Sequence, residues 1–320
     1  MAFTKKEINE LFDGQQVSDI LPYNSIDADP IVQQEIAQGN GHISISGVQP
    51  KFSLVVDQGV LRLVRPKEQG TFILKPAPTA LFILDRAYCP ANEHLTMQLA
   101  SQVYGIETAA CALCRFGNGQ EAYLTRRFDI TSGGGKFPQE DFASVAGLNK
   151  QNAGKDYKYN ALSYEDCADL IHAHAKAAPV EILKFFRLVV FNYLVLNDDA
   201  HLKNFSFIQR KKGDVRLTPA YDLMNTSLHL SMPTIFALKK GLFKEGMIID
   251  DTHSVSRASF MDFGTRIGLN EPLLNRELNK FAEEHPLAEN LINHSHLSQE
   301  LKKHYLDSYH YRLTTLKNTL

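Results

Sequence analysis

One apolar segment, residues 180–196, constrains the fold of this 320-residue chain more than any other feature. A helix that crosses a membrane needs roughly 20 consecutive apolar residues. This segment is shorter, and it is interrupted by Glu181, Lys184, Arg187 and Asn192. Apolar residues nevertheless lie around its whole helical circumference, which is typical of a helix buried in a large protein. We therefore expect a central core helix here and no membrane association.

The sequence LVLNDDAHLKNFSF, from Leu194 to Phe207, places charged residues directly behind this segment. It contains two aspartates, two asparagines, a histidine and a lysine within the eight residues 197–204. Charged side chains seldom lie against a buried hydrophobic segment unless they are paired, bind a metal ion or take part in a reaction. The segment is therefore a candidate functional site, and a solvated loop of salt-bridged carboxylates is the alternative.

Composition narrows the class of protein. Hydrophobic residues make up 44% of the chain, enough for a large core in one large domain or two lobes. The formal net charge of −2 provides no basic field for nucleic acid, so contact with DNA would need a local patch or a protein partner. The first residues, MAFTKKEINELFDGQQ, lack the apolar core of a secretory signal, which predicts a cytoplasmic protein.

The hydrophobic pattern changes along the chain from β-type to helical. The runs HISIS, KFSLVV, GVLRLV and TFILK predict an antiparallel sheet over residues 42–75, and two more strands are expected at 109–116 and 122–128. Between them we expect a helix with Asn92 as its N-cap. Later in the chain, a capping box at Ser163–Asp166 begins a series of helical patterns. These patterns predict an α+β fold with a mainly β N-terminal lobe, residues 1–130, and a mainly α C-terminal lobe, residues 131–320.

The four cysteines include a CxxC pair, Cys111 and Cys114. No second pair follows at a spacing that would complete four zinc ligands. The surrounding sequence is strand-like, and residues three apart on a strand point to opposite faces. Reduced, buried thiols are therefore a better interpretation than a metal or redox site.

The charged loop has the residue types that phosphoryl transfer from ATP requires. In protein kinases the catalytic-loop aspartate precedes a metal-binding asparagine by five positions, and Asp199 precedes Asn204 by five. Asp222 follows an expected hairpin, as the second metal-binding residue of kinases does, and Mg²⁺ prefers such oxygen ligands. Lys75, at the end of a strand-like run, is the candidate for the lysine that contacts the phosphates. Glu93 is either its ion-pair partner or an acidic residue favoured near the start of a helix.

Four motifs together resemble the HipA family of bacterial toxin serine/threonine kinases: NDDAHLKNFSF, TPAYDLMN, QEDFAS at residues 139–144 and SISGVQPKFSL at residues 44–54. The chain resembles most the shorter HipT kinases of three-component HipBST toxin–antitoxin systems. In those systems the N-terminal subdomain of HipA proteins is a separate small protein, and here the nucleotide-loop motif begins near residue 44. The resemblance implies a bilobal protein-kinase-like fold with a nucleotide-binding N-terminal lobe, and the use of ATP and Mg²⁺.

The resemblance also implies roles for individual residues. Asp199 would be the catalytic base, and Asn204 and Asp222 would bind Mg²⁺. His201 and Lys203 belong to the same loop, and Lys203 would neutralise charge on the transferred phosphoryl group. The family autophosphorylates in the nucleotide loop, so Ser44 and Ser46 would be the acceptors. The implied ATP contacts are Lys75, Ser46, Gly47, Val48, Gln49, Lys51, Arg126 and Phe128, with the last two in the hinge segment LTRRF.

Partners follow from the same resemblance. We expect a HipB-like DNA-binding antitoxin and a HipS-like small protein, with DNA reached only through the antitoxin. The protein substrate would be an aminoacyl-tRNA synthetase, of the tryptophan type in the HipT branch, whose phosphorylation inhibits translation. Two alternatives stay open: a kinase of small molecules, and a catalytically silent corepressor that binds a DNA-binding antitoxin.

Overall fold

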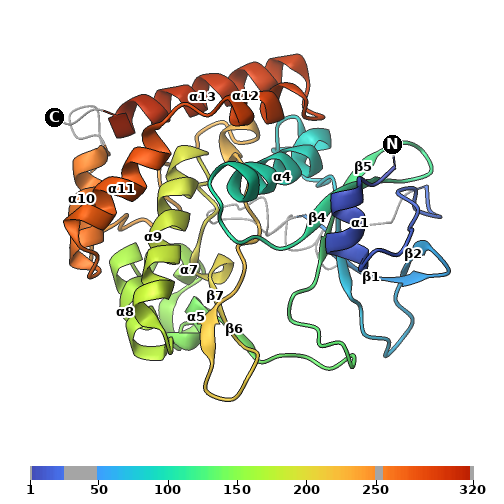
Figure 1. Cartoon of the computed structure of the whole chain (residues 1–320), viewed down its shortest axis with the longest axis horizontal. Helices are drawn as coiled ribbons and strands as arrows, with labels where there is room; N and C mark the ends of the chain where they lie inside the picture. The colour runs from blue at the N-terminus through green and yellow to red at the C-terminus, as the bar shows by residue number, and fades with distance from the viewer. Residues whose placement is uncertain (1, 25–48, 249–254, 318–320) are drawn as a thin grey trace.

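The computed structural model describes residues 2–24, 49–248 and 255–317. A lobe rich in β-structure lies at the right of Figure 1, and a helical lobe lies at the left. This arrangement confirms the expected α+β architecture with two lobes. The boundary placed at residue 130 remains a prediction.

The N-terminal lobe is built on an antiparallel sheet with strand order β2-β1-β3-β5-β4. Helix α1 (Lys5–Phe12) packs on this sheet, and the ring of Phe12 lies 5.3 Å from that of Phe72. The two expected later strands are confirmed, whereas the run HISIS lies outside the described residues. The strands are β1 (Phe52–Asp57), β2 (Val60–Leu63), β3 (Phe72–Pro76), β4 (Cys111–Arg115) and β5 (Glu121–Arg126).

Helix α4 (Cys89–Gln98) connects the sheet to the helical lobe and continues as a π-helical turn, η2 (Leu99–Val103). The prediction that Asn92 caps this helix is wrong, because α4 begins three residues earlier. Pro90 lies in its first turn, where the fixed φ of proline favours a helix and its missing N–H costs little. Asn92 is instead buried and donates from Nδ2 to the carbonyl oxygen of Asn225 (2.7 Å).

The helical lobe surrounds α9 (Ala178–Leu194), which is the predicted core helix. The capping box at Ser163 is also confirmed, since its hydroxyl accepts a hydrogen bond from the N–H of Asp166 (3.0 Å). A small sheet with order β6-β7-β8 lies beside these helices and contains the expected hairpin. The remaining elements are η1 (Arg86–Tyr88), β6 (Gln139–Asp141), α5 (Phe142–Val145), α6 (Lys150–Ala153), α7 (Tyr157–Asn160), α8 (Tyr164–His174), η3 (Leu202–Asn204), β7 (Ser206–Gln209), β8 (Val215–Leu217), η4 (Thr226–Leu228), α10 (Arg257–Arg266), α11 (Glu271–Ala282), α12 (Pro286–Asn293) and α13 (Gln299–Lys317).

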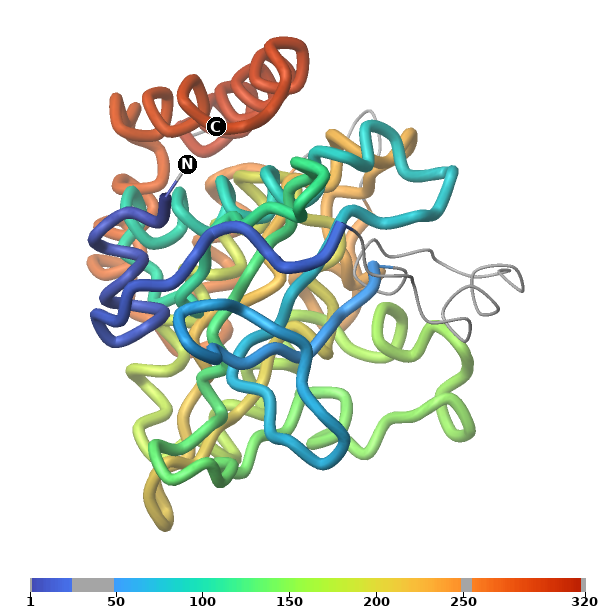
Figure 2. Tube along the Cα trace, turned by 90° about the vertical axis from the view of Figure 1, so that its right-hand side faces the viewer, coloured from blue at the N-terminus to red at the C-terminus, as the bar shows by residue number. Residues whose placement is uncertain are grey.

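Helices α12 and α13 lie at the top of the molecule in Figures 1 and 2, and both contact α4. The hydroxyl of Tyr305 on α13 is 2.9 Å from that of Thr96 on α4. Leu95 and Leu99 accordingly belong to the hydrophobic core of the helical lobe. Helix α4 is thus held by both lobes, which fixes its position relative to the charged loop.

The cysteines and the lengths of the helices bear on two expectations from the sequence. All four cysteines are free and buried. Burial raises the pKa of the Cys111 thiol to about 12, and it also raises the pKa of the Cys114 thiol. The expected burial of these thiols is confirmed, and a raised pKa keeps them in the less reactive protonated form. Among the described helices, none combines the length and the apolar character that a bilayer crossing requires.

Candidate active site

Hydrogen bonds fix the path of the charged loop where it leaves α9. Leu196 has a φ of 52°, in the left-handed region that non-glycine residues seldom adopt. Its carbonyl oxygen accepts hydrogen bonds from the N–H (3.1 Å) and the hydroxyl (2.7 Å) of Thr226. Asn197 donates to Oδ1 of Asn192 in the last turns of α9 (2.9 Å). The core helix and the η4 segment therefore hold the loop from two sides.

The carboxylate of Asp199 is held within this loop. Asp199 is 6% exposed, and its Oδ1 accepts a hydrogen bond from the hydroxyl of Tyr159 (2.8 Å). Asn204 closes the loop by donating from Nδ2 to the carbonyl oxygen of Asp199 (2.7 Å). This orientation commits the amide nitrogen of Asn204 to the backbone, so its oxygen is the atom suited to bind a metal ion.

His201 lies beside the same carboxylate, with 3.9 Å between its Nε2 and Oδ1 of Asp199. Nζ of Lys158 is 3.0 Å from that ring nitrogen. Burial lowers the pKa of His201 to about 3, and the positive charge of Lys158 acts in the same direction. The imidazole is therefore neutral at physiological pH.

Lys75 projects from β3 into a buried position between two carboxylates. Its Nζ lies 2.5 Å from Oε1 of Glu93 and 2.5 Å from Oδ1 of Asp222. Burial alone would lower the pKa of Lys75, but the charges of Asp222 and Glu93 outweigh it and raise the pKa. Burial raises the pKa of Glu93 to about 7, against the attraction of Lys75. The ion-pair interpretation of Glu93 is thus confirmed.

Asp222 follows β8 in a strained backbone conformation, with a φ of 55°. Its second oxygen, Oδ2, lies 3.3 Å from Nζ of Lys51. The neighbouring Tyr221 packs against Phe128, with ring centroids 5.8 Å apart. The strained turn therefore directs the Asp222 carboxylate toward two lysines of the N-terminal lobe.

The structure brings most of the predicted site residues together. A cavity of about 10 Å³ lies between the lobes, and Gln49 lines it while donating to the carbonyl oxygen of Pro76 (2.9 Å). Lys203, at the edge of the loop, is 3.8 Å from Asp141 on β6. The other predicted residues Ser44, Ser46, Gly47 and Val48 lie outside the described residues. The residues that line the cavity are Gln49, Lys75, Glu93, Asn197, Asp199, Asp222, Met224 and Thr226.

Arg126 is not part of this cluster. Its guanidinium makes two hydrogen bonds of 2.7 Å to the carboxylate of Asp13, which follows α1. Asp198, the first aspartate of the charged loop, supports the backbone of its surroundings, because its Oδ2 accepts a hydrogen bond from the N–H of Thr234 (2.8 Å).

Sequence reasoning missed several of the described residues near the site, including Met224 and Thr226, which line the cavity. Lys158 and Tyr159 contact the loop from α7, and Asn197 lines the cavity between the lobes. Asn197 lies inside the quoted motif and could have been found there. The contacts of Lys158 and Tyr159 span about 40 positions of sequence, and no local pattern signals them.

The residues present fit a magnesium ion. Among the described residues, no group of three or more His, Cys, Asp or Glu side chains is arranged to hold a metal ion. Mg²⁺ rarely needs such a cage, because it is commonly bound by one or two protein oxygens together with waters and substrate phosphates. Asp222 and Asn204 would supply a carboxylate and an amide oxygen of this kind.

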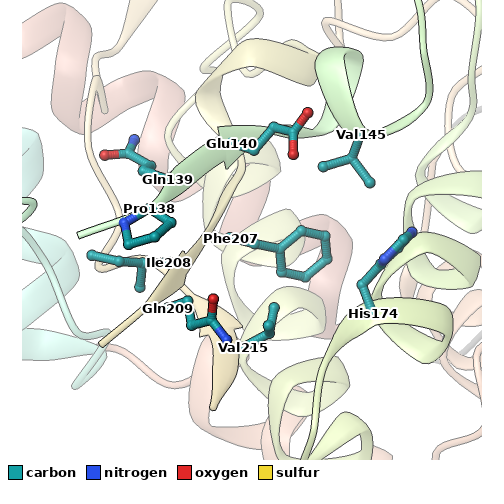
Figure 3. A pocket seen from close by; sticks show the side chains of 9 residues that line it. All are labelled: Pro138, Gln139, Glu140, Val145, His174, Phe207, Ile208, Gln209 and Val215. Carbon is teal, nitrogen blue, oxygen red and sulfur yellow. The ribbon is translucent and has the colours of Figure 1, made fainter. Parts of the chain in front are cut away.

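A separate cavity of about 370 Å³ lies on the small sheet of the helical lobe (Figure 3). Glu140 lines it, whereas the adjacent Asp141 approaches Lys203. Phe207 contributes an aromatic wall. Among the described residues, those that line this cavity include none of the candidate catalytic residues.

Comparisons with known proteins show the family of the chain. The family model of the HipA-like C-terminal domain matches residues 43–288. A protein of Haemophilus influenzae named as a kinase is 27% identical, over 98% of this chain and 92% of that protein. The serine/threonine-protein kinase toxin HipA of Shewanella oneidensis is also 27% identical, over 79% of this chain and 58% of the toxin.

The fold has a counterpart among solved structures. The complex of HipA, HipB and operator DNA from Shewanella oneidensis contains a chain that superposes with a TM-score of 0.68. The match covers 92% of this chain and 72% of that chain, at 22% identity. Since the family model matches more than half of the sequence and the fold agrees, the chain belongs to the family of HipA-like C-terminal domain proteins, which relates it to the HipA serine/threonine kinase toxins.

Proposed function

We propose that this chain is an ATP- and Mg²⁺-dependent serine/threonine protein kinase and the toxin of a bacterial toxin–antitoxin system. The observation that carries the proposal is the buried Lys75, held between Glu93 and Asp222 in a cavity that Asp199 also lines. A lysine on a strand, its glutamate partner on the next helix and an aspartate after a hairpin are the elements that position ATP in protein kinases.

Each residue has a physical reason for its proposed role. Lys75 carries a positive charge that Glu93 holds in place, so it can bind phosphate oxygens. Asp199 can accept the proton of the attacking hydroxyl, because one carboxylate oxygen is already fixed by a hydrogen bond. Asn204 and Asp222 would hold Mg²⁺, which when bound neutralises charge on the phosphates.

The cleft between the lobes is closed around Lys75 and Asp222. A cavity of about 10 Å³ is much smaller than the roughly 300 Å³ of typical small-molecule sites. We therefore expect ATP to separate Lys51 from Asp222 and to move the lobes apart, with the adenine near Phe128.

We propose further that the chain is a HipT-type kinase that phosphorylates Ser44 and Ser46 in its own nucleotide loop. The support is the motif SISGVQPK, which has a single glycine and two serines. A phosphoserine adds nearly two negative charges, so it would repel the phosphates of ATP. Self-phosphorylation would then limit activity.

The proposed partners are an aminoacyl-tRNA synthetase of the tryptophan type as substrate, and HipB-like and HipS-like antitoxins as inhibitors. The Shewanella HipA structure contains HipB and operator DNA, which supports a DNA-binding antitoxin as partner. The synthetase and the HipS-like protein are supported by the motif resemblance. Phosphorylation of the synthetase would inhibit translation.

Intact mass and phosphopeptide mapping after incubation with Mg-ATP test the proposal. Wild-type protein, first treated with phosphatase, should gain phosphate at Ser44 or Ser46. Asp199→Asn should retain the thermal stability of the wild type and lose at least 10²-fold in transfer rate, because general-base catalysis contributes about 10²–10⁴-fold.

Two results would contradict the proposal. One is equal phosphate gain in Asp199→Asn. The other is a folded wild-type protein that forms no ADP and modifies neither itself, the synthetase nor small hydroxyl compounds. That second result would favour the silent corepressor, which can be recognised by antitoxin binding without ATP.

A further inference from the structure

Two neighbouring residues outside the phosphoryl-transfer motifs, Lys158 and Tyr159, contact the candidate catalytic loop. Both lie on the short helix α7. The hydroxyl of Tyr159 donates to Oδ1 of Asp199 at 2.8 Å, and Nζ of Lys158 lies 3.0 Å from Nε2 of His201. Each of the two therefore meets a different polar side chain of the loop.

Tyr159 is anchored independently of Asp199. Its side chain is fully buried, and its carbonyl oxygen accepts a hydrogen bond from the N–H of Lys239 (2.9 Å). Its ring meets the imidazole of His201 edge to face, with centroids 5.0 Å apart. A buried ring held by packing and by the backbone gives its hydroxyl a fixed position, which is what a support for a catalytic group requires.

Lys158 is the second member of this pair, and it is half-buried. Its Nζ lies 4.9 Å from the ring centroid of Tyr159, within the range of a cation–π contact. A lysine ammonium can only donate hydrogen bonds, so Nε2 of His201 must accept and its Nδ1 carries the proton. Lys158 thereby selects one tautomer of His201.

We propose that Lys158 and Tyr159 are positioning residues that orient His201 and Asp199 and so set the rate of phosphoryl transfer. This inference rests on the kinase function proposed above. A base must lie within hydrogen-bond reach of the proton that it abstracts, and small displacements of a reacting group lower rates strongly. The hydrogen bond from Tyr159 to Oδ1 fixes the orientation of the Asp199 carboxylate.

The chain offers matched variants to test this. Tyr159→Phe removes one hydroxyl and keeps the buried ring. Tyr164→Phe is the control, because it also removes a buried tyrosine hydroxyl from the loop. That hydroxyl donates to the carbonyl oxygen of Ala200 (3.1 Å) and not to the carboxylate of Asp199. Lys158→Met removes the charge of Lys158, and Lys158→Arg restores it.

The measurement is ADP formation at saturating Mg²⁺ over a range of ATP concentrations, together with the melting temperature of each variant. Tyr159→Phe and Lys158→Met should each lower the maximal rate at least tenfold and leave the ATP concentration for half-maximal rate within twofold of wild type. Tyr164→Phe should stay within twofold in both quantities. Lys158→Arg should recover most of the rate lost in Lys158→Met.

Three outcomes would overturn the inference. Tyr159→Phe and Lys158→Met could both keep the wild-type maximal rate, or Tyr164→Phe could lose as much rate as Tyr159→Phe. The loss could also appear only in the half-maximal ATP concentration. A wild-type protein without ADP formation would instead contradict the proposed kinase function itself, and the inference with it.

Discussion

Asp222 shows how much of the site depends on a single residue. Its left-handed backbone conformation is one that asparagine and aspartate tolerate better than other non-glycine residues. Its two carboxylate oxygens meet Lys75 and Lys51, which come from different parts of the N-terminal lobe. Asp222 therefore combines a strained backbone position after the hairpin with ion pairs to two lysines of the cleft.

Asp222→Asn should preserve this backbone conformation and weaken the proposed magnesium site. A neutral amide oxygen is a poorer ligand for a hard cation than a carboxylate. We expect the Mg²⁺ concentration for half-maximal ADP formation to rise at least tenfold, with part of the lost rate recovered at high Mg²⁺. A titration of activity with Mg²⁺ at fixed ATP checks this.

Asp141→Asn is the matched control for that titration. Asp141 approaches Lys203 at the edge of the site and caps α5, a role that asparagine fills equally well. Its substitution should leave the Mg²⁺ dependence unchanged. If the Mg²⁺ concentration for half-maximal ADP formation rose equally in both variants, the effect would come from the lost negative charge in the cleft. Asp222 would then not be a metal ligand.

At the scale of elements, α4 determines where the two halves of the site meet. Its residue Glu93 binds Lys75 of the sheet, and the preceding Asn92 binds the backbone of Asn225 beyond the charged loop. The Asn92 amide donates to the Asn225 carbonyl oxygen (2.7 Å) and accepts from the Asn225 N–H (3.1 Å). One buried side chain thus replaces a missing pair of backbone hydrogen bonds between two elements.

Asn92→Ala should lower the free energy of unfolding by about 2–3 kcal/mol, because it leaves a buried N–H and a buried C=O of Asn225 without their partner. Denaturant unfolding monitored by fluorescence or circular dichroism measures the change. Gln98→Ala, at a half-buried position of the same helix, should change the free energy of unfolding by less than about 0.5 kcal/mol. Equal losses in the two variants would contradict the role assigned to Asn92.

At the scale of the whole molecule, an ion pair outside the charged loop joins the lobes. His296, between α12 and α13, binds Glu121 at the start of β5. The hydrogen bond to Glu121 raises the pKa of His296 above its usual value, although partial burial opposes this. As pH rises, His296 therefore keeps its proton to a higher pH in the folded state than in the unfolded state.

The sign of the resulting pH dependence follows from this shift. A histidine with a raised pKa stabilises the folded state fully below its unfolded pKa of about 6.5, and the contribution is lost as pH rises through the folded pKa. His296→Gln should therefore lower the melting temperature by about 1–2 °C at pH 6, since half-exposed ion pairs are weak. At pH 9 the difference should vanish.

Melting curves at the two pH values test this, with His294→Gln as the control. His294 is close in sequence, and its ring bonds the carbonyl oxygen of Asn290 instead of a carboxylate. A deficit of His296→Gln that is as large at pH 9 as at pH 6 would show that His296 acts by packing alone.

The sequence by itself determined the parts of this protein that depend on local geometry. The core helix α9, the strands of the larger sheet within the described residues and the capping box at Ser163 follow from periodicity and short-range hydrogen bonding. The five-residue spacing of Asp199 and Asn204 likewise reflects one short loop, whose ends a side chain can bridge. The resemblance of the motifs indicated the family, and the match of the family model to residues 43–288 confirms it.

Only the tertiary structure decided which distant residues meet. It paired Glu93 with Lys75, placed Tyr159 on Asp199 and bound Arg126 to Asp13 instead of the cleft. Such contacts join positions from 18 to more than 100 residues apart, and they depend on how α4, α7 and the sheet pack together. Side-chain periodicity specifies which face of an element is buried, but it carries no information about which partner that face will meet.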